Sequence, residues 1–375
     1  MLYVSRRRAG VAVACVLMLF SALRVAAANA EPSQGSLTTG KYSNAAGTLA
    51  YQLYVPASYR TGTPVPLVVA LHGCTQTADT FRKLTGFDDV AAKRGFIVVY
   101  PEQSKSGNYM GCWNWFQQQH LQRGGGEPLL IAGITQAVAQ RYSVDKNRIF
   151  VTGLSAGGAM ATVMGVTYPD LYAAVGIGSG CEYTAGAACA GYKGTDPEQA
   201  GQAAYKAMGK FARPVPFVVF QGDKDTTVPP VNADQLVRSW QVTADYADDG
   251  QKNRSVPTMP VDTVNGSVPN GGRSYTVKYY ADSHDRLLGE YWVVHGMGHA
   301  WSGGNASQQY ADATGPNQSA AMFDFFMSHP LGEPGPPASK PGGKWPWPTP
   351  SWPTAPGKVT WPKSPGVGYR LPTMK

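Results

Sequence analysis

The 375-residue sequence contains few charged residues: Asp, Glu, Lys and Arg make up 15% of it, against about 25% in an average globular protein. Hydrophobic residues make up 43%. A disordered chain shows the opposite balance, with low hydrophobicity and high charge, so this class of protein is excluded. The chain is long enough for two domains, but a single large α/β domain also reaches this length.

The central part of the chain lacks an excess of positive charge, although the formal net charge of the whole sequence is +8. Residues 1–30 contain four arginines and no acidic residue, and residues 331–375 contain six basic residues and one acidic residue. Between these two ends, 22 basic residues stand against 23 acidic ones. A basic nucleic-acid-binding body is therefore disfavoured, and we expect no nucleic-acid partner.

Long apolar runs are also missing, except for one run of 15 residues from Ala9 to Leu23. This run follows the three arginines 6–8 and precedes Ala28-Asn29-Ala30, which has the small-x-small pattern of a cleavage site. The arrangement is typical of a secretory signal peptide and is short for a bilayer span. We predict a signal peptide at residues 1–30, secretion to the extracellular space or the periplasm, and no stable membrane span. The alternative is an uncleaved membrane anchor.

Cysteine and histidine are scarce, and none of them has the paired spacing of zinc ligands, so we expect no metal and no cofactor. Four cysteines would remain after removal of the signal peptide: Cys74, Cys112, Cys181 and Cys189. An even number in an oxidising compartment favours disulfide bonds. Three pairings are possible. We favour Cys181–Cys189, which closes a short loop, together with Cys74–Cys112, which joins two loops.

Apolar runs and helical stretches alternate between residues 31 and 330. Strands are expected near residues 49–55, 66–71, 96–100, 149–152, 173–177, 217–220, 275–280 and 291–294. Helices are expected near residues 78–93, 127–141, 156–168, 197–211 and 231–244. Short runs without polar residues are typical of strands buried on both faces. The order predicts one α/β domain with a mainly parallel central sheet and helices on both faces. The strand at 49–55 alternates in polarity and is expected to be antiparallel. Residues 247–273 are rich in Asp, Asn, Gly and Pro and are expected to form a segment on the surface.

Residues 331–375 differ in composition from the rest. They contain 12 of the 29 prolines and four tryptophans, Trp345, Trp347, Trp352 and Trp361. Proline at this density prevents a helix or a central strand, so an extended or disordered tail is expected. Its tryptophans and lysines could bind a polymer surface, or the tail could be an inert solvated terminus.

The strongest chemical motif is Gly153-Leu154-Ser155-Ala156-Gly157, which follows the apolar run 149–152 and precedes a helical stretch. Strand, G-x-S-x-G and helix in this order are typical of a nucleophile elbow, a sharp turn that exposes a reactive serine. Ser155 is therefore the candidate nucleophile. In this architecture the acid and the histidine of the triad follow the serine along the chain.

Two aspartates, Asp223 and Asp225, follow the expected strand at 217–220. Asp225 fits the G-x-x-D-x-x-V spacing from Gly222 to Val228 and is our candidate for the acid, whereas Asp223 is expected to shape the turn.

Six histidines are candidates for the base, and His299 is favoured because it lies in a glycine-containing loop after the last strand. His295 is still at the strand end and is expected to be structural. His72 and His120 precede Ser155, and His72 is expected near the oxyanion loop, whereas His284 and His329 lie away from strand ends.

Acyl transfer also needs N–H donors for the oxyanion of the tetrahedral intermediate. The backbone N–H of Ala156, directly after the nucleophile, is one candidate. The second is expected from the loop after the first central strand, and we choose the N–H of Cys74. A disulfide between Cys74 and Cys112 would hold this donor rigidly.

Together these motifs resemble the poly(3-hydroxybutyrate)-depolymerase-like esterases of the α/β-hydrolase superfamily. The similar segments within residues 35–330 are 71–74 (LHGC), 111–116 (GCWNWF), 123–127 (RGGGE), 152–158 (TGLSAGG) and 296–301 (GMGHAW). The resemblance implies an α/β-hydrolase fold, the triad Ser155, Asp225 and His299, and the Cys74 oxyanion site. Trp113, Trp115 and Trp301 are candidates for contacts with the acyl group, the alternative being ordinary packing.

The sequence therefore predicts a secreted serine esterase that hydrolyses poly(3-hydroxybutyrate)-like polyester, or its oligomers, through an acyl-enzyme. Feruloyl or acetyl esters of polysaccharides and the amide bonds of poly(aspartic acid) are alternative substrates of the same chemistry. A protein of a different class, which binds a polymer or a cell wall without catalysis, is the remaining alternative.

Overall fold

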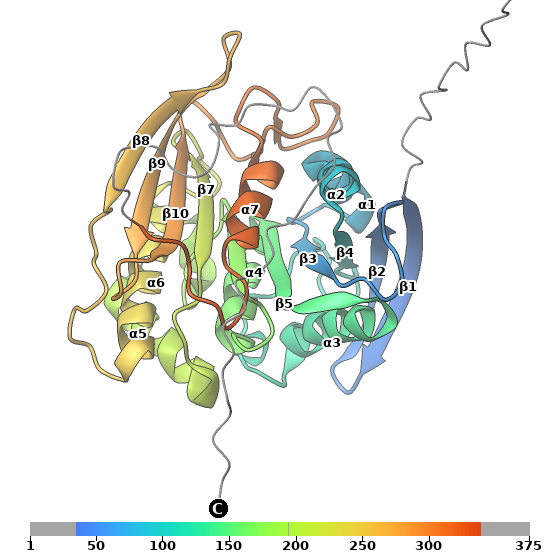
Figure 1. Cartoon of the computed structure of the whole chain (residues 1–375), viewed down its shortest axis with the longest axis horizontal. Coiled ribbons are helices and arrows are strands. Elements are labelled where there is room, and N and C mark those ends of the chain that lie inside the picture. The colour runs from blue at the N-terminus through green and yellow to red at the C-terminus, as the bar shows by residue number, and fades with distance from the viewer. Residues whose placement is uncertain (1–34, 194, 339–375) are drawn as a thin grey trace, which may run out of the picture. The chain divides into compact units, whose positions relative to one another are not determined.

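The computed structural model describes residues 35–193 and 195–338 (Figure 1). The predicted signal peptide and the predicted tail from residue 339 onward lie outside the described residues. One sheet dominates the described chain, with its ten strands in the order β1-β2-β4-β3-β5-β6-β7-β10-β9-β8. The strands are β1 (Ser36–Asn44), β2 (Gly47–Val55), β3 (Val65–Leu71), β4 (Ile97–Glu102), β5 (Val144–Leu154), β6 (Ala174–Gly178), β7 (Phe217–Gly222), β8 (Asp262–Ser267), β9 (Ser274–Ala281) and β10 (Leu287–Val294).

The centre of this sheet is parallel, as predicted. Every neighbouring pair from β4 through β3, β5, β6 and β7 to β10 is parallel. The strands outside this block, β1 and β2 at one edge and β9 and β8 at the other, pair antiparallel. Two short strands, β11 (Trp301–Ser302) and β12 (Ala311–Asp312), form a separate parallel pair.

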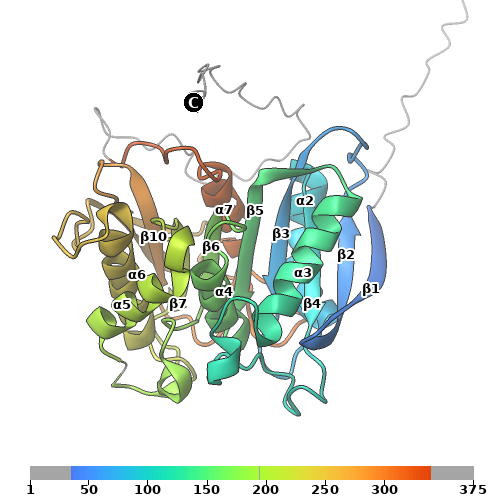
Figure 2. The ribbon, with the colours of Figure 1, turned by 90° about the horizontal axis from the view of Figure 1, so that it is seen from below.

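Helices cover both faces of the sheet (Figure 2). Four of them, α3, α4, α5 and α6, lie on one side, and α1, α2 and α7 lie on the other. Their bounds are α1 (Ala78–Thr85), α2 (Phe87–Arg94), α3 (Gly126–Arg141), α4 (Ala156–Thr167), α5 (Pro197–Met208), α6 (Val231–Asp249) and α7 (Gln318–Met327). The predicted fold class, an α/β-hydrolase fold with a mainly parallel sheet between two helical layers, is confirmed.

Strand β3 shows why the central strands are apolar throughout. Leu67, Val69 and Leu71 belong to the core under α3 and α4, whereas Val68 and Ala70 belong to the core under α1, α2 and α7. All five side chains are fully buried. Because successive side chains of a strand point to opposite faces, both faces of β3 are buried between the two helical layers and its run of residues is apolar throughout.

Several elements differ from the sequence expectations, and the edge strand β1 was not expected at all. The helix expected at 78–93 is two helices, because Gly86 adopts a left-handed φ of 62° and ends α1. The polar excursion at 247–273 contains β8, whose side chains are mostly exposed and whose pairing with β9 depends on backbone hydrogen bonds. Helix α7 was not anticipated, although Asn317 caps it by accepting a hydrogen bond from the N–H of Ala320 (2.9 Å).

The first residues of the predicted tail stay in contact with the domain. The N–H of Leu331 donates to the carbonyl oxygen of Asn147 (2.7 Å), and the N–H of Ala338 donates to the carbonyl oxygen of Asp285 (2.8 Å). Backbone contacts with the domain therefore continue beyond the expected boundary at residue 330. Among the helices that the structure describes, none is both long and apolar enough to cross a bilayer.

Glu290 is a carboxylic acid on the central strand β10 and is only 5% exposed. One oxygen accepts a hydrogen bond from the indole N–H of Trp292 (2.8 Å). Burial raises the pKa of Glu290 from 4.5 to about 7, more than the Trp292 hydrogen bond lowers it. Because the folded state holds this proton more tightly than the unfolded chain, wild-type stability falls as pH rises from about 4.5 to about 7.

Glutamine at position 290 would keep a hydrogen-bond acceptor and remove this titration. We expect Glu290→Gln to gain stability over wild type progressively between pH 4.5 and 7, by up to about 3 kcal/mol, because one unit of pKa corresponds to about 1.4 kcal/mol. Denaturant unfolding as a function of pH measures the gain. The exposed Glu333→Gln is the matched control, and parallel pH profiles for Glu290→Gln and wild type would contradict the prediction.

Candidate active site

Ser155 lies in a sharp turn between β5 and α4, with a positive φ of 58° that is strained for a non-glycine residue. Its N–H donates to the carbonyl of Gly178 on the neighbouring strand (2.9 Å). A Cβ atom at position 157 would lie 2.0 Å from the carbonyl oxygen of Leu71, and one at position 153 would lie 2.3 Å from the carbonyl carbon of Gly157. The glycines of the motif are therefore required for the close approach of helix and strands.

Asp225 and His299 form a hydrogen-bonded pair. Asp225 follows β7, His299 lies in the loop after β10, and His299 Nδ1 is 2.8 Å from Asp225 Oδ2. The other carboxylate oxygen accepts the backbone N–H groups of Thr227 and Val228, each at 2.9 Å. Burial alone would raise the pKa of Asp225, but the His299 hydrogen bond, the charge of His299 and the two N–H donors together lower it. The ionised Asp225 thus orients the imidazole through Nδ1, and within the described residues His299 Nε2 makes no hydrogen bond.

Ser155 and His299 line the same cavity, which has a volume of about 160 Å³. The cavity is lined by Gly73, Cys74, Gln76, Leu154, Ser155, Thr227, His299 and Tyr310. Within the part of the chain that the structure describes, no hydrogen bond joins the Ser155 hydroxyl to His299. Such catalytic hydrogen bonds are often long without substrate and shorten in the reacting complex.

The loop after β3 carries the expected oxyanion donor Cys74, and Cys74 is disulfide-bonded to Cys112 as predicted. Neither the N–H of Cys74 nor that of Ala156 donates to another group within residues 35–193 and 195–338. Both N–H groups are therefore without a hydrogen-bond partner in the described chain, and Cys74 lines the cavity.

His72 fixes the start of this loop through buried hydrogen bonds. It is fully buried, its Nε2 accepts the N–H of Gln103 (3.0 Å), and its Nδ1 donates to the carbonyl of Gly73 (2.8 Å). The indole N–H of Trp113 donates to the carbonyl of His72 (3.0 Å). Burial lowers the pKa of His72, so the ring stays neutral and acts in positioning.

Asp223 and His295 form a second aspartate–histidine pair beside the first. His295 Nδ1 is 3.0 Å from Asp223 Oδ2, and the N–H of Gly296 donates to Asp223 Oδ1 (2.7 Å). This pair links the two loops that carry Asp225 and His299. None of the other histidines, His120, His284 and His329, is among the residues that line the cavity.

The three tryptophans differ in their surroundings. Trp113 and Trp301 are fully buried, and the indole N–H of Trp301 donates to the hydroxyl of Ser319 (3.0 Å). These contacts support packing roles for both, and we do not propose them as substrate contacts. Trp115 is partly exposed and packs on the cluster around the second predicted disulfide, Cys181–Cys189, which is present. A substrate contact of Trp115 stays a prediction.

Glu127, at the start of α3, is a positioning residue whose role was not predicted from the sequence. Its carboxylate accepts the backbone N–H of Asn114 (2.7 Å), the side-chain amide of Asn114 (2.6 Å) and the side-chain amide of Gln103. Burial raises its pKa to about 7 despite these donors. Glu127 thereby holds the loop of Cys112 and Trp113 to the domain. The Gly-Gly-Gly-Glu segment was the only sequence signal for it.

No group of three or more His, Cys, Asp or Glu side chains in the described chain is arranged to hold a metal ion.

The elbow geometry predicts that alanine substitution destabilises the protein much more at one glycine than at another. Gly157→Ala places a methyl group 2.0 Å from the carbonyl oxygen of Leu71, whereas a methyl group at Gly298 meets nothing within 4 Å. We expect Gly157→Ala to lose several kcal/mol of stability or to fail to fold, and Gly298→Ala to unfold at nearly the wild-type temperature. Thermal unfolding of both variants measures this. Equal melting temperatures would contradict the backbone contact.

Residues 49–260, more than half of the chain, match the family model described as Esterase PHB depolymerase. Poly(3-hydroxyalkanoate) depolymerase C of Paucimonas lemoignei is 32% identical over 291 residues, which cover 75% of this chain and 66% of that protein. Probable acetylxylan esterase A of Neosartorya fischeri is 34% identical over 245 residues, which cover 61% of this chain and 65% of that protein. The chain thus spans slightly less than two thirds of the length of these relatives.

The fold also has a solved counterpart. The structure of an acetyl xylan esterase from Aspergillus awamori superposes with a TM-score of 0.58 and 26% sequence identity, covering 71% of this chain and 94% of that one. The matched residues 49–260 contain the serine elbow and Asp225, and His299 completes the arrangement from the following segment. On the combined match of sequence and fold, the chain belongs to the esterase PHB depolymerase family of α/β-hydrolases.

Proposed function

We propose that the protein is a serine esterase that cleaves carboxylic esters through an acyl-enzyme intermediate. The observation that carries the proposal is the Asp225–His299 pair (2.8 Å) at the cavity that Ser155 also lines. A serine hydroxyl is a weak nucleophile unless a base removes its proton, and the base must be oriented by a third group. Family membership supports the same chemistry.

In the proposed reaction, Ser155 Oγ attacks the ester carbonyl carbon while His299 Nε2 accepts the hydroxyl proton. The N–H groups of Cys74 and Ala156 stabilise the oxyanion of the tetrahedral intermediate. When the intermediate collapses, the alcohol leaves and takes the proton from His299. Water then attacks the acyl-enzyme with His299 as its base, which releases the acid and restores Ser155.

For the substrate, we propose poly(3-hydroxybutyrate)-like polyesters or their oligomers. The matching family model and the relative from Paucimonas lemoignei support this class. The second candidate is an acetylated polysaccharide, which is favoured by the acetylxylan esterase relatives. The cavity has a volume of about 160 Å³. A cavity of this size suits a short acyl group, which both substrate classes supply.

We further propose that the protein acts outside the cytoplasm. Two disulfide bonds, Cys74–Cys112 and Cys181–Cys189, support this location because disulfides are rare in reducing compartments. The first of them joins the oxyanion loop to the segment that Glu127 holds, so an oxidising environment would also serve the site itself.

Replacing the nucleophile tests the mechanism. We expect Ser155→Ala to lower kcat/KM for a short nitrophenyl ester by at least about 10⁴-fold, because the variant loses the hydroxyl that forms the acyl-enzyme in the proposed reaction. Initial-rate kinetics measure the loss, with the exposed Ser307→Ala as the control at wild-type activity. Undiminished hydrolysis by Ser155→Ala would overturn the mechanism. A wild-type protein without activity on any ester would instead support the non-catalytic polymer-binding alternative.

The two substrate classes are separated by their products. We expect wild-type protein, but not Ser155→Ala, to release soluble 3-hydroxybutyrate from amorphous polymer granules, at a higher rate than it releases acetate from acetylated xylan. Chromatographic quantification of both acids gives the comparison. The reverse order would favour the polysaccharide ester, and release of neither acid by a protein active on short esters would reject both substrate classes.

A further inference from the structure

Gln76 is a cavity residue to which the reaction above gives no role. It lies between the oxyanion loop and α1, two residues after Cys74, and lines the cavity together with Ser155 and His299. Its side chain is nearly buried, with a residue exposure of 9%. A primary amide in this position is costly to desolvate unless its polar atoms are used.

The carbonyl oxygen of the Gln76 side chain is held next to the nucleophile. It accepts the backbone N–H of Gly73 at 2.8 Å. An ideal Cβ atom on Gly73 would lie 3.1 Å from this oxygen and 3.4 Å from Ser155 Cβ, so the Gln76 amide and the Ser155 side chain flank one point. Because the donor from Gly73 requires an oxygen opposite it, the orientation of the amide is determined and its nitrogen lies on the other side.

The nitrogen of the same amide has no protein acceptor. In the described part of the chain, Gln76 Nε2 donates no hydrogen bond, and it is not among the buried side-chain atoms that lack a partner. The atom is therefore accessible, and the space open to this nearly buried side chain is the cavity that Gln76 lines. Two N–H bonds are thus available where a substrate oxygen would bind.

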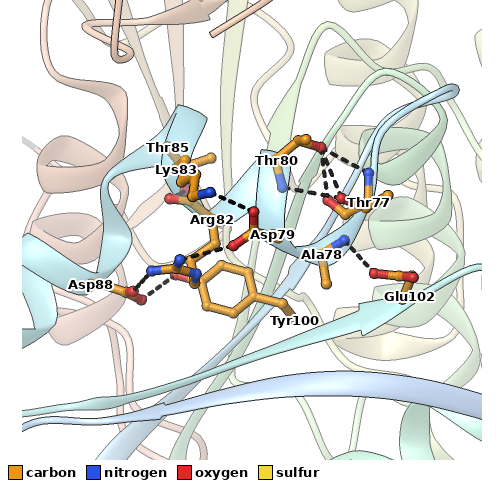
Figure 3. A network of polar contacts seen from close by, with 10 residues as sticks. All are labelled: Thr77, Ala78, Asp79, Thr80, Arg82, Lys83, Thr85, Asp88, Tyr100 and Glu102. Atoms are coloured by element: carbon orange, nitrogen blue, oxygen red, sulfur yellow. Dashed lines mark hydrogen bonds and ion pairs between the residues drawn. The ribbon is translucent and has the colours of Figure 1, made fainter. Parts of the chain in front are cut away.

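The backbone on both sides of Gln76 is fixed. Its own N–H donates to the carbonyl of Gly73 (3.3 Å), and the next residue, Thr77, exchanges side-chain and backbone hydrogen bonds with Thr80. The following N–H, of Ala78, donates to Glu102 at the end of β4 (2.8 Å), as Figure 3 shows. A donor on such a rigid support needs little reorganisation during the reaction.

Ion pairs hold the rest of α1 to its neighbours (Figure 3). Arg82 bridges Asp79 on its own helix (2.9 Å) and Asp88 on α2 (2.7 Å), and the hydroxyl of Tyr100 on β4 donates to Asp88 (2.8 Å). The helix that follows Gln76 is therefore held to both α2 and β4.

We propose that Gln76 is a further catalytic residue, whose side-chain N–H₂ donates to the ester carbonyl oxygen as it becomes the tetrahedral oxyanion. It acts as a third donor beside the N–H groups of Cys74 and Ala156. The inference rests on the proposed serine esterase function. A purely structural role would involve only the Gly73 N–H and the Gln76 oxygen, so the two roles use different atoms of one amide.

Gln76→Glu separates the two roles. The variant keeps an oxygen for the Gly73 N–H but replaces the donor nitrogen with a second oxygen, which carries negative charge. We expect kcat for a short nitrophenyl ester to fall by about 10²-fold or more, the usual effect of losing one oxyanion donor, with KM changed by less than about threefold. The exposed Gln202→Glu on α5 makes the same charge change far from the cavity and is the matched control.

Each outcome has a distinct meaning. A Gln76→Glu protein with wild-type kcat would overturn the inference, and so would a loss confined to KM, since a transition-state donor acts on kcat. Wild-type protein without Ser155-dependent esterase activity would contradict the proposed function itself, whereas active wild type with unaffected Gln76→Glu contradicts only this inference. All rates are compared at the plateau of each pH profile.

A measurement on wild-type protein covers the case in which Gln76→Glu does not fold. Diethyl 4-nitrophenyl phosphate would transfer its diethylphosphoryl group to Ser155 Oγ as the bond from phosphorus to 4-nitrophenolate breaks. The phosphoryl oxygen of the resulting tetrahedral adduct stands in for the oxyanion. We expect a crystal structure of this adduct to place Gln76 Nε2 within about 3.2 Å of that oxygen, a normal hydrogen-bond distance. An amide nitrogen turned away from the phosphoryl oxygen would overturn the inference.

Discussion

The backbone of Gly157 lies against the backbone of Leu71 so closely that no side-chain atom fits between them: a Cβ atom would be 2.0 Å from the Leu71 carbonyl oxygen. This contact brings the start of α4 to the end of β3, so that the loop of Cys74 and Gln76 lies beside Ser155 in its strained turn. The N–H of Ala156 has no acceptor within the helix because Ala156 is the first residue of α4.

Around this contact, polar groups that are almost completely buried hold the loops in place. The neutral His72 joins the oxyanion loop to Gln103, and Glu127 joins Gln103 to Asn114 and so to the loop that contains Cys112. On the other side of the cavity, Asp225 is held by two backbone N–H groups before it orients His299. Buried groups of this kind cost stability unless they are paired, and here their pairing preorganises the site for acyl transfer.

The cavity does not by itself distinguish between the two substrate classes that the names of the relatives suggest. It is small, and its walls come mainly from the oxyanion loop, the elbow and the loops after β7 and β10, all of which serve the chemistry. Few residues of the cavity wall are therefore available to recognise a particular polymer. Selection between a polyester and an acetylated polysaccharide would therefore depend on residues outside the cavity.

Much of the fold and the proposed triad could be predicted from local patterns. Continuous apolar runs indicated the central strands because both faces of the sheet are covered, and the glycines around Ser155 indicated the elbow because only glycine fits there. The edge strand β8 and helix α7 were missed, since β8 has exposed polar side chains and α7 follows a long irregular segment without a preceding strand pattern.

The sequence by itself was sufficient to predict the central strands and the proposed nucleophile, acid and histidine along the chain, because these predictions depend on neighbouring residues: apolar runs for the strands and short motifs for the proposed triad. Tertiary structure decided which polar groups meet across the chain: Glu127 with Asn114, His72 with Gln103, and the Gln76 amide with the cavity. It also decided that Trp113 and Trp301 are buried. Burial and hydrogen-bond pairing depend on how distant segments pack, and no local pattern carries that information.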